Sequence, residues 1–173
     1  MLRPAIAALF LIATPAGAEP LGIDFGALPA GTALYYSNSF QGRMVDIYVG
    51  FDGQAHHVER RAGSPYGEKL SDHFFNALGL EVRRVDADGA VSDFAPFNCE
   101  RFLGTCTHTL TTARGPSEVA VETTQSGGSY QSTITFLANG FERRRRFELV
   151  NHGLYAFVRE NDTQIALDDI VRP

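Results

Sequence analysis

The sequence lacks most of the short motifs that identify an enzyme. It has no Gly-x-Ser-x-Gly turn of the kind that carries a nucleophilic serine, and no phosphate-binding loop. It has only two cysteines, and their spacing is wider than the Cys-x-x-Cys of redox-active pairs. We therefore predict no catalytic residue and no cofactor.

Positive charge is also scarce, which limits the classes of partner. The chain has 15 lysines and arginines against 20 aspartates and glutamates, a formal net charge of −5. A surface for nucleic acid or for an anionic membrane needs an excess of positive charge. We therefore expect neither of these as the main partner.

Long apolar runs are absent, and the most apolar stretch lies at the start of the chain. Residues 5–13 are apolar, follow a basic residue, and precede Pro15 and a small-residue stretch that ends at Ala18. This order is typical of a signal peptide at 1–18, cleaved after Ala18, and no run approaches the ~20 apolar residues that span a bilayer. We expect an exported protein, periplasmic or secreted, with no membrane span and one β-rich domain over residues 19–173.

The two cysteines become informative in an exported protein, because disulfides persist where thiols are not kept reduced. Cys99 and Cys106 flank a short loop with Gly104 and lie between strand-like runs. Only one pairing is possible. The sequence predicts a structural disulfide across the mouth of a β-hairpin, closing a loop of about eight residues and contributing roughly 2.5 kcal/mol.

Short runs rich in Val, Ile, Thr, Tyr and Phe recur after the signal peptide, separated by turn residues. Dipeptides such as Asp52-Gly53 and Asn139-Gly140 supply the positive φ that tight hairpins require. Because short loops join antiparallel neighbours, the pattern predicts a mainly β, antiparallel up-and-down meander of about ten strands. The expected strands are residues 32–40, 43–51, 54–61, 80–86, 90–97, 105–112, 118–125, 130–137, 141–149, 154–160 and 164–170.

Residues 64–79 interrupt this pattern. The stretch offers serines as helix starts and ends on a glycine, and Leu70, Phe74 and Leu78 recur at intervals of four. We predict one short helix here. It would cover one end of the sheet, either as a lid or as a plain cap on the core.

A long meander must protect its edges, which a closed or partly open barrel does. In strand 43–51 the apolar Val45, Ile47 and Val49 alternate with Asp46 and Tyr48. The pattern indicates one buried face, the apolar one, and one wetter face.

This layout of strands and one helix is similar to that of the lipocalins and of the periplasmic lipoprotein carriers, and the resemblance implies a small-molecule carrier. The Gly-x-Trp signature of lipocalins is absent, because the chain has no tryptophan. Residues 126–130, Ser-Gly-Gly-Ser-Tyr, are similar to the Ser-Gly-x-x-Tyr loop of periplasmic lysozyme inhibitors, without the aromatic and basic residues expected just downstream. That second resemblance implies an enzyme inhibitor.

The stretch at 141–149 reads FERRRRFEL, and alternate residues of a strand share a face. If one face borders a cavity, its two arginines bind a carboxylate or phosphate head group and its phenylalanines line an apolar pocket. The alternative is an edge strand whose arginines pair with Glu122 or Glu160. The residues of this face are Phe141, Arg143, Arg145, Phe147 and Leu149.

Five histidines invite a metal or acid–base interpretation. His56 and His57 are adjacent, so they point to opposite faces of a strand and do not bind one ion together. A tight hairpin before them pairs His56 with Val49 on the apolar face, which makes His56 a candidate ligand contact. The others share no metal-ligand spacing, and we predict no metal site. They are His73, His108 and His152.

Three functions are consistent with these patterns. The first is a periplasmic binding or carrier module for an apolar, amphiphilic or acidic small molecule. The second is an envelope protein-interaction module or enzyme inhibitor, which predicts an exposed apolar patch near residues 99–106. The third is a hydrolase using His73 or His108, for which the sequence names no complete set of catalytic groups.

Overall fold

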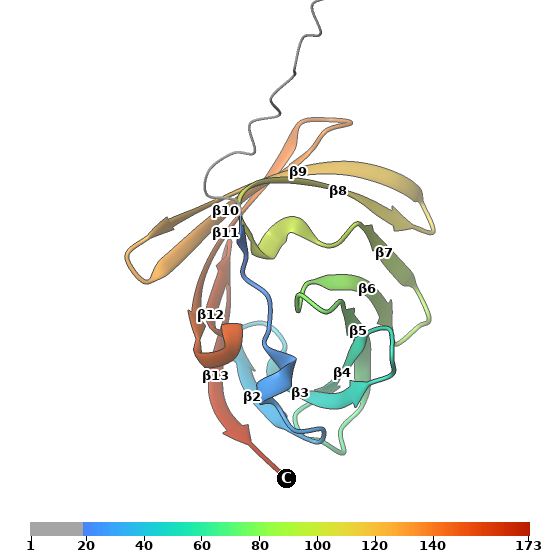
Figure 1. The fold of residues 1–173 in the computed structure, drawn as a ribbon, viewed down its shortest axis with the longest axis vertical. Helices are drawn as coiled ribbons and strands as arrows, with labels where there is room; N and C mark the ends of the chain where they lie inside the picture. Colours follow the sequence, from blue (N-terminus) through green and yellow to red (C-terminus); the bar gives the residue numbers. More distant parts are fainter. Residues whose placement is uncertain (1–18) are drawn as a thin grey trace, which may run out of the picture.

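Twelve consecutive strands form a closed antiparallel barrel (Figure 1). The computed structural model describes residues 19–173, and the predicted signal peptide lies outside the described residues. Each strand pairs with the next in sequence, and β2 pairs with β13 to close the ring. The strands are β2 Ala33–Asn38, β3 Gly42–Phe51, β4 His56–Ala62, β5 Lys69–Phe75, β6 Glu81–Asp86, β7 Val91–Ala95, β8 Phe102–Thr112, β9 Gly115–Ser126, β10 Ser129–Phe136, β11 Phe141–Val150, β12 Leu154–Glu160 and β13 Thr163–Val171.

The predicted meander and barrel are confirmed, and the turn dipeptides act as expected. In the β3–β4 turn the Asp52 carboxylate accepts hydrogen bonds from the N–H groups of Gln54 and Ala55, each at 2.8 Å, and Gly53 has a φ of 97°. This local bonding satisfies the backbone where the chain reverses. Short turns of this kind are why nearly every strand pairs with its neighbour in sequence.

The predicted helix at 64–79 is wrong. This stretch contains β5, which pairs with β4 on one side and β6 on the other. Leu70 and Phe74 are four residues apart, but that interval fits a strand as well as a helix, because residues at even intervals share a face of a strand. The only helical elements among the described residues are three short 3-10 turns: η1 Phe25–Ala27, η2 Cys99–Arg101 and η3 Asn151–Gly153.

The inward face of β3 is the reverse of the one expected. Asp46 and Tyr48 line the interior, whereas Val49 is half exposed. A carboxylate is tolerated inside because Arg60 on β4 pairs with it. The β3–β4 turn is longer than the two-residue hairpin expected, and the register also shifts between Tyr48 and Gly50. As a result His56 pairs with Phe51 and not with Val49.

One end of the barrel is covered by the N-terminal strap, which we define as residues 19–28. β1 (Glu19–Pro20) pairs with β8, and the chain then crosses the ring of strands to η1 (Figure 1). Along the way it bonds to loops of three hairpins that open at this end. Backbone N–H groups of the strap donate to carbonyl oxygens in these loops: Leu21 to Arg101 at 2.8 Å, Ile23 to Gly79 at 3.1 Å and Asp24 to His152 at 2.9 Å.

The buried apolar residues form two separate clusters. The larger one includes Phe25 and Leu28 of the strap, packed with residues of β2, β3, β4 and β12. The smaller one joins Cys99 to residues of β9 and β10. Residues of both clusters line one internal cavity. Within residues 19–173, no helix has the length and apolar character that crossing a bilayer requires.

Candidate functional site

The barrel interior holds a cavity of about 440 Å³, which is within the size range of small-molecule pockets. It extends from Phe25 and Leu28 of the strap to Asn161 and Thr163 at the β12–β13 turn, at the opposite end. Most of its wall is apolar. Apolar side chains in the wall include Leu34, Val58, Phe75, Phe94, Leu110, Val119, Ile134, Phe136, Leu154, Val158 and Ile165.

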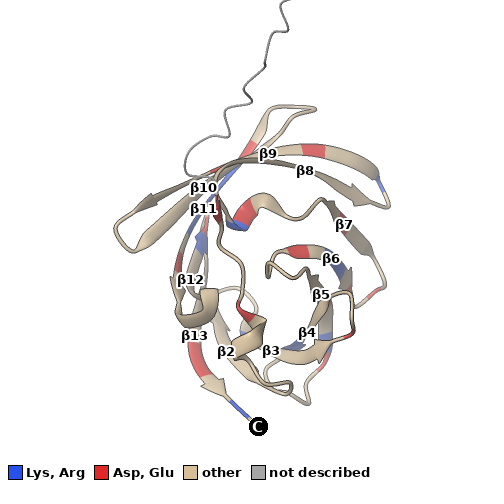
Figure 2. Cartoon of the chain, viewed as in Figure 1, with Lys and Arg blue, Asp and Glu red and all other residues tan. Residues whose placement is uncertain are grey.

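Charged side chains interrupt this wall. Five arginines and four carboxylates line the cavity, so it carries one positive charge in excess although the whole chain is acidic. Figure 2 shows an acidic and a basic residue side by side on η2, and these are Glu100 and Arg101. The charged residues of the cavity wall are Arg60, Arg84, Arg101, Arg143 and Arg145, with Asp46, Glu81, Glu100 and Glu160.

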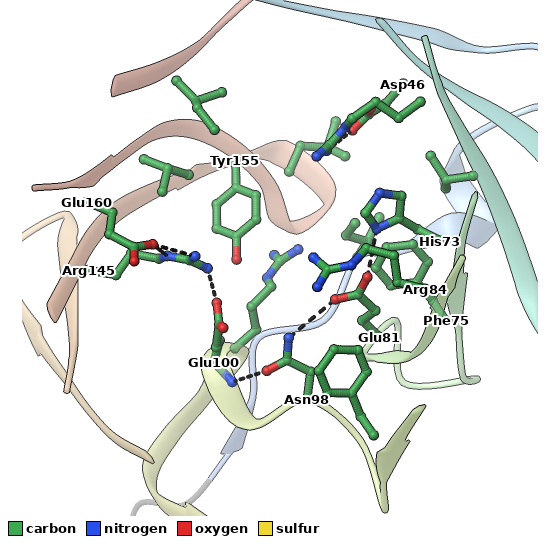
Figure 3. Close-up of a pocket in the computed structure, with 18 of the residues that line it drawn as sticks. Asp46, His73, Phe75, Glu81, Arg84, Asn98, Glu100, Arg145, Tyr155 and Glu160 are labelled. Atoms are coloured by element: carbon green, nitrogen blue, oxygen red, sulfur yellow. Dashed lines mark hydrogen bonds and ion pairs between the residues drawn. The ribbon is translucent and has the colours of Figure 1, made fainter. Parts of the chain in front are cut away.

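Arg143 and Arg145 face this cavity from β11, but both already form ion pairs with carboxylates of the protein. Arg143 donates two hydrogen bonds to Glu160. Arg145 donates to both Glu160 and Glu100 (Figure 3). Burial raises the pKa of Glu160, but the hydrogen bonds from Arg143, the larger effect, and from Arg145 lower it to about 2. The pairing with Glu160 considered from the sequence is therefore present, inside the barrel and not on an edge strand. These two arginines have little free charge left for an anionic ligand.

Arg60 is neutralised in the same way. Its guanidinium donates two hydrogen bonds of 2.7 Å to the Asp46 carboxylate. Burial opposes the charge on Arg60, but the adjacent Asp46 outweighs it and raises the pKa of the arginine. This pair contributes no net charge to the cavity.

Arg101 differs from these three arginines because it has no carboxylate partner. Its side chain is 7% exposed, and its Nη2 donates to the Gly153 carbonyl oxygen. Its Nε and Nη1 are buried and make no hydrogen bond to any described residue. The guanidinium lies over the Tyr155 ring, 4.5 Å from the ring centroid. Burial lowers the pKa of Arg101, which reflects the cost of an unpaired charge.

Tyr36 and Tyr155 line the same cavity. Figure 3 shows the Tyr155 hydroxyl pointing into the space between the Arg145–Glu160 pair and the groups on the opposite wall. Burial, followed by the nearby Asp46, raises the pKa of Tyr36, so its hydroxyl keeps its proton. Tyr155 thus lies against Arg101, and the charge of Arg101 also acts on Tyr36.

A chain of hydrogen bonds joins Ser71 to His73 and Glu81, and the last two line the wall opposite Arg145. The Ser71 hydroxyl is 2.8 Å from Nε2 of His73, and Nδ1 of His73 is 2.7 Å from the Glu81 carboxylate. The same order of groups occurs in serine hydrolases. Here, however, Ser71 is buried and does not line the cavity. Its strand pairs with β4 on one side and with β6 on the other, so Ser71 lies within the sheet. We assign the chain to fixing the orientation of His73.

The remaining predicted site residues lie in different places. Phe141 is at the rim of the barrel and 55% exposed. Phe147 is fully buried, between Tyr130 and Tyr155, with ring centroids 5.1 and 5.6 Å away. His56 stacks on Phe25 of the strap at 4.7 Å, and its Nδ1 is 2.9 Å from the Tyr48 hydroxyl. None of these three side chains is part of the cavity wall.

His56 and His57 point to opposite sides, as the sequence predicts. His57 lies outside the barrel, where its Nε2 is 2.7 Å from the Asp72 carboxylate. His108 lines the cavity, accepts a hydrogen bond from the Cys99 N–H at 3.3 Å, and has its pKa lowered by burial. It is therefore a neutral, satisfied side chain. No group of three or more metal-ligating side chains occurs in the described part of the chain.

The disulfide between Cys99 and Cys106 is confirmed, with the two Cα atoms 5.6 Å apart. Its setting is not the predicted hairpin mouth. Cys99 is in η2 and Cys106 is within β8, so the bond ties the β7–β8 connection to a strand and fixes the turn that carries Arg101. No large apolar residue of positions 99–106 is exposed.

No pattern in the sequence indicates the groups that distinguish this cavity. Arg101 has an ordinary place in a predicted loop, and Tyr36 and Tyr155 belong to strands at opposite ends of the chain. Only closure of the ring through β2, β13 and β12 brings the two tyrosines together. Comparisons with protein-family models, curated proteins and solved structures found no match.

Proposed function

We propose that this protein is an exported binding or carrier module that holds a small amphiphilic molecule inside the barrel. The observation that carries the proposal is a cavity of about 440 Å³ with apolar walls and an excess positive charge. A protein interior is normally packed without large voids, so an open interior in a closed barrel favours a ligand. The export expected from the N-terminal sequence supports a periplasmic location.

The shape of the cavity supports a ligand that enters at one end. The N-terminal strap covers the end that carries the β5–β6, β7–β8 and β11–β12 loops. The opposite end is reached by Asn161 and by the partly exposed Arg143 and Glu160. A molecule with an apolar tail would enter there and bury the tail against the aliphatic and aromatic wall, which is the main favourable term in such binding.

Native mass spectrometry of residues 19–173, purified from a bacterial periplasm, tests this proposal. We expect a bound small molecule, released by solvent extraction. Because the chain has no tryptophan, binding to the emptied protein is followed with an amphiphilic fluorescent probe such as ANS. We expect saturable binding of one probe per barrel.

A substitution that fills the cavity supplies the control. Leu110 lines the cavity, and the neighbouring Thr111 on the same strand is exposed. Leu110→Trp is expected to abolish saturable binding, and Thr111→Trp to leave it unchanged, with circular dichroism confirming that both variants are folded. Equal binding by the two variants would place the ligand outside the barrel and overturn the proposal.

A further inference from the structure

Arg101 is held rigidly at the closed end of the cavity. It ends η2, directly beside the Cys99–Cys106 disulfide, and its carbonyl oxygen accepts the Leu21 N–H of the strap. Its guanidinium reaches across to the carbonyl of Gly153 and stacks on Tyr155. The position of the positive charge is therefore set before any ligand arrives.

This charge is incompletely satisfied, because Nε and Nη1 of Arg101 lack partners. Buried charges in proteins are normally paired, since an unpaired one loses the solvation that water gave it. Arg84 also has an unpaired Nε, but its Nε lies 3.8 Å from the Asp86 carboxylate and its charge acts on Glu81. Arg101 is thus the cavity arginine with an uncompensated charge.

We propose that Arg101, assisted by the hydroxyls of Tyr36 and Tyr155, binds the carboxylate head of an apolar-tailed acid whose tail lies along the cavity toward the β12–β13 turn. The inference rests on the proposed function and names its ligand class. A guanidinium and two phenols are all donors, and a carboxylate is acceptor-only when ionised.

The charge count of the wall favours a single negative charge. Five arginines face four carboxylates, so one monoanion balances the cavity, whereas a doubly charged phosphate would leave an excess of negative charge. The raised pKa of Tyr36 agrees with this assignment, because a protonated phenol donates to an anion.

The test compares two probes that share a tail and differ in the head group, decanoate and decanol, by displacement of the fluorescent probe. We expect wild-type protein to bind decanoate at least about tenfold more tightly than decanol, the discrimination typical of a hydrogen-bonded charge. Equal affinities would overturn the head-group assignment and leave the proposed function standing. Failure of decanoate, decanol and the fluorescent probe alike to bind would overturn the proposed function as well.

Arg101→Met separates this arginine from the others. The variant removes a buried charge that lacks a carboxylate partner and keeps the length of the side chain, so we expect it to fold. It should lose the preference for decanoate and keep its affinity for decanol. Arg146→Met, on the outer face of β11 where the arginine side chain is 62% exposed, is the matched control and should keep the preference. Decanoate preference that survives in Arg101→Met would overturn the assignment.

Discussion

Arg143 and Glu160 form a two-bond ion pair inside the barrel. Nε of the arginine lies 2.6 Å from Oε1, and Nη2 lies 2.9 Å from Oε2. Arg145 donates to the same carboxylate. The sequence suggests that Arg143 and Arg145 are free to bind an anionic ligand. In the structure Glu160 neutralises them, so their main role is structural.

Replacement of Glu160 by Gln is expected to destabilise the fold by about 1–2 kcal/mol near neutral pH, less than the full pKa shift implies because the pair is partly exposed to solvent. The folded-state pKa of about 2 is below the usual 4.5. The contribution of Glu160 is thus complete above its unfolded-state pKa and is lost as pH falls through the folded-state value.

Urea denaturation of wild type and Glu160→Gln near pH 7 and near pH 3 measures this effect. The difference in unfolding free energy should shrink at the lower pH. Glu142→Gln, at an exposed position of β11, is the control and should change stability little at either pH. A Glu160→Gln difference that stays constant with pH would contradict the ion-pair account.

The disulfide is expected to contribute about 2.5 kcal/mol, from the closure of an eight-residue loop. Reduction of the wild-type protein should lower its urea midpoint accordingly. The Cys99→Ser/Cys106→Ser double variant should start at that lower midpoint and not respond to reductant. A wild-type midpoint unaffected by complete reduction would contradict this prediction.

The strap depends on a close approach at Gly22. A Cβ at this position would lie 1.6 Å from the Leu78 carbonyl oxygen, so Gly22→Ala must move the strap away from the β5–β6 loop. We expect a loss of about 1–3 kcal/mol, the usual cost of overpacking. Hydrogen exchange at the Ile23 amide should accelerate. Gly128→Ala, where a Cβ meets nothing within 4 Å, should show neither effect.

Ser71→Ala tests whether the Ser71–His73–Glu81 chain is catalytic. We expect a loss of about 1 kcal/mol, because Nε2 of His73 loses its partner. Hydrolysis of p-nitrophenyl esters should equal the buffer background in both proteins. Turnover by the wild type that disappears in the variant would show an esterase and contradict our assignment.

Most of the architecture was predictable from the sequence, because hairpin turns and strand patterns are local properties. Eleven strands were expected in the right places, and β5 was missed since its apolar spacing fits two periods. The sequence predicted less well which side chains of each strand point into the barrel. On β3 one bulge near Gly50 shifts the register, and Asp46 lies inside because Arg60 on the next strand neutralises it.

The candidate site was predictable only in part. The alternation at 141–149 put Arg143 and Arg145 on one face, and both border the cavity. Their neutralisation by Glu160 and Glu100 depends on β12 and η2, which pair with or approach β11 only in the folded barrel. The importance of Arg101 has the same origin. Arg101 matters because no carboxylate lies beside it in the folded barrel. The lack of such a contact cannot be read from a sequence.

The N-terminal strap also bears on how the barrel forms. Its hydrogen bonds reach Gly79, Arg101 and His152, and the seam between β2 and β13 joins the two ends of the chain. Contacts between residues so distant in sequence slow folding, because a long loop must close before they form. The hairpins can form one by one, but the strap cannot complete its hydrogen bonds until β11 and β12 have paired. The strap precedes every strand of the barrel in the sequence, and it nevertheless docks only after those strands have paired.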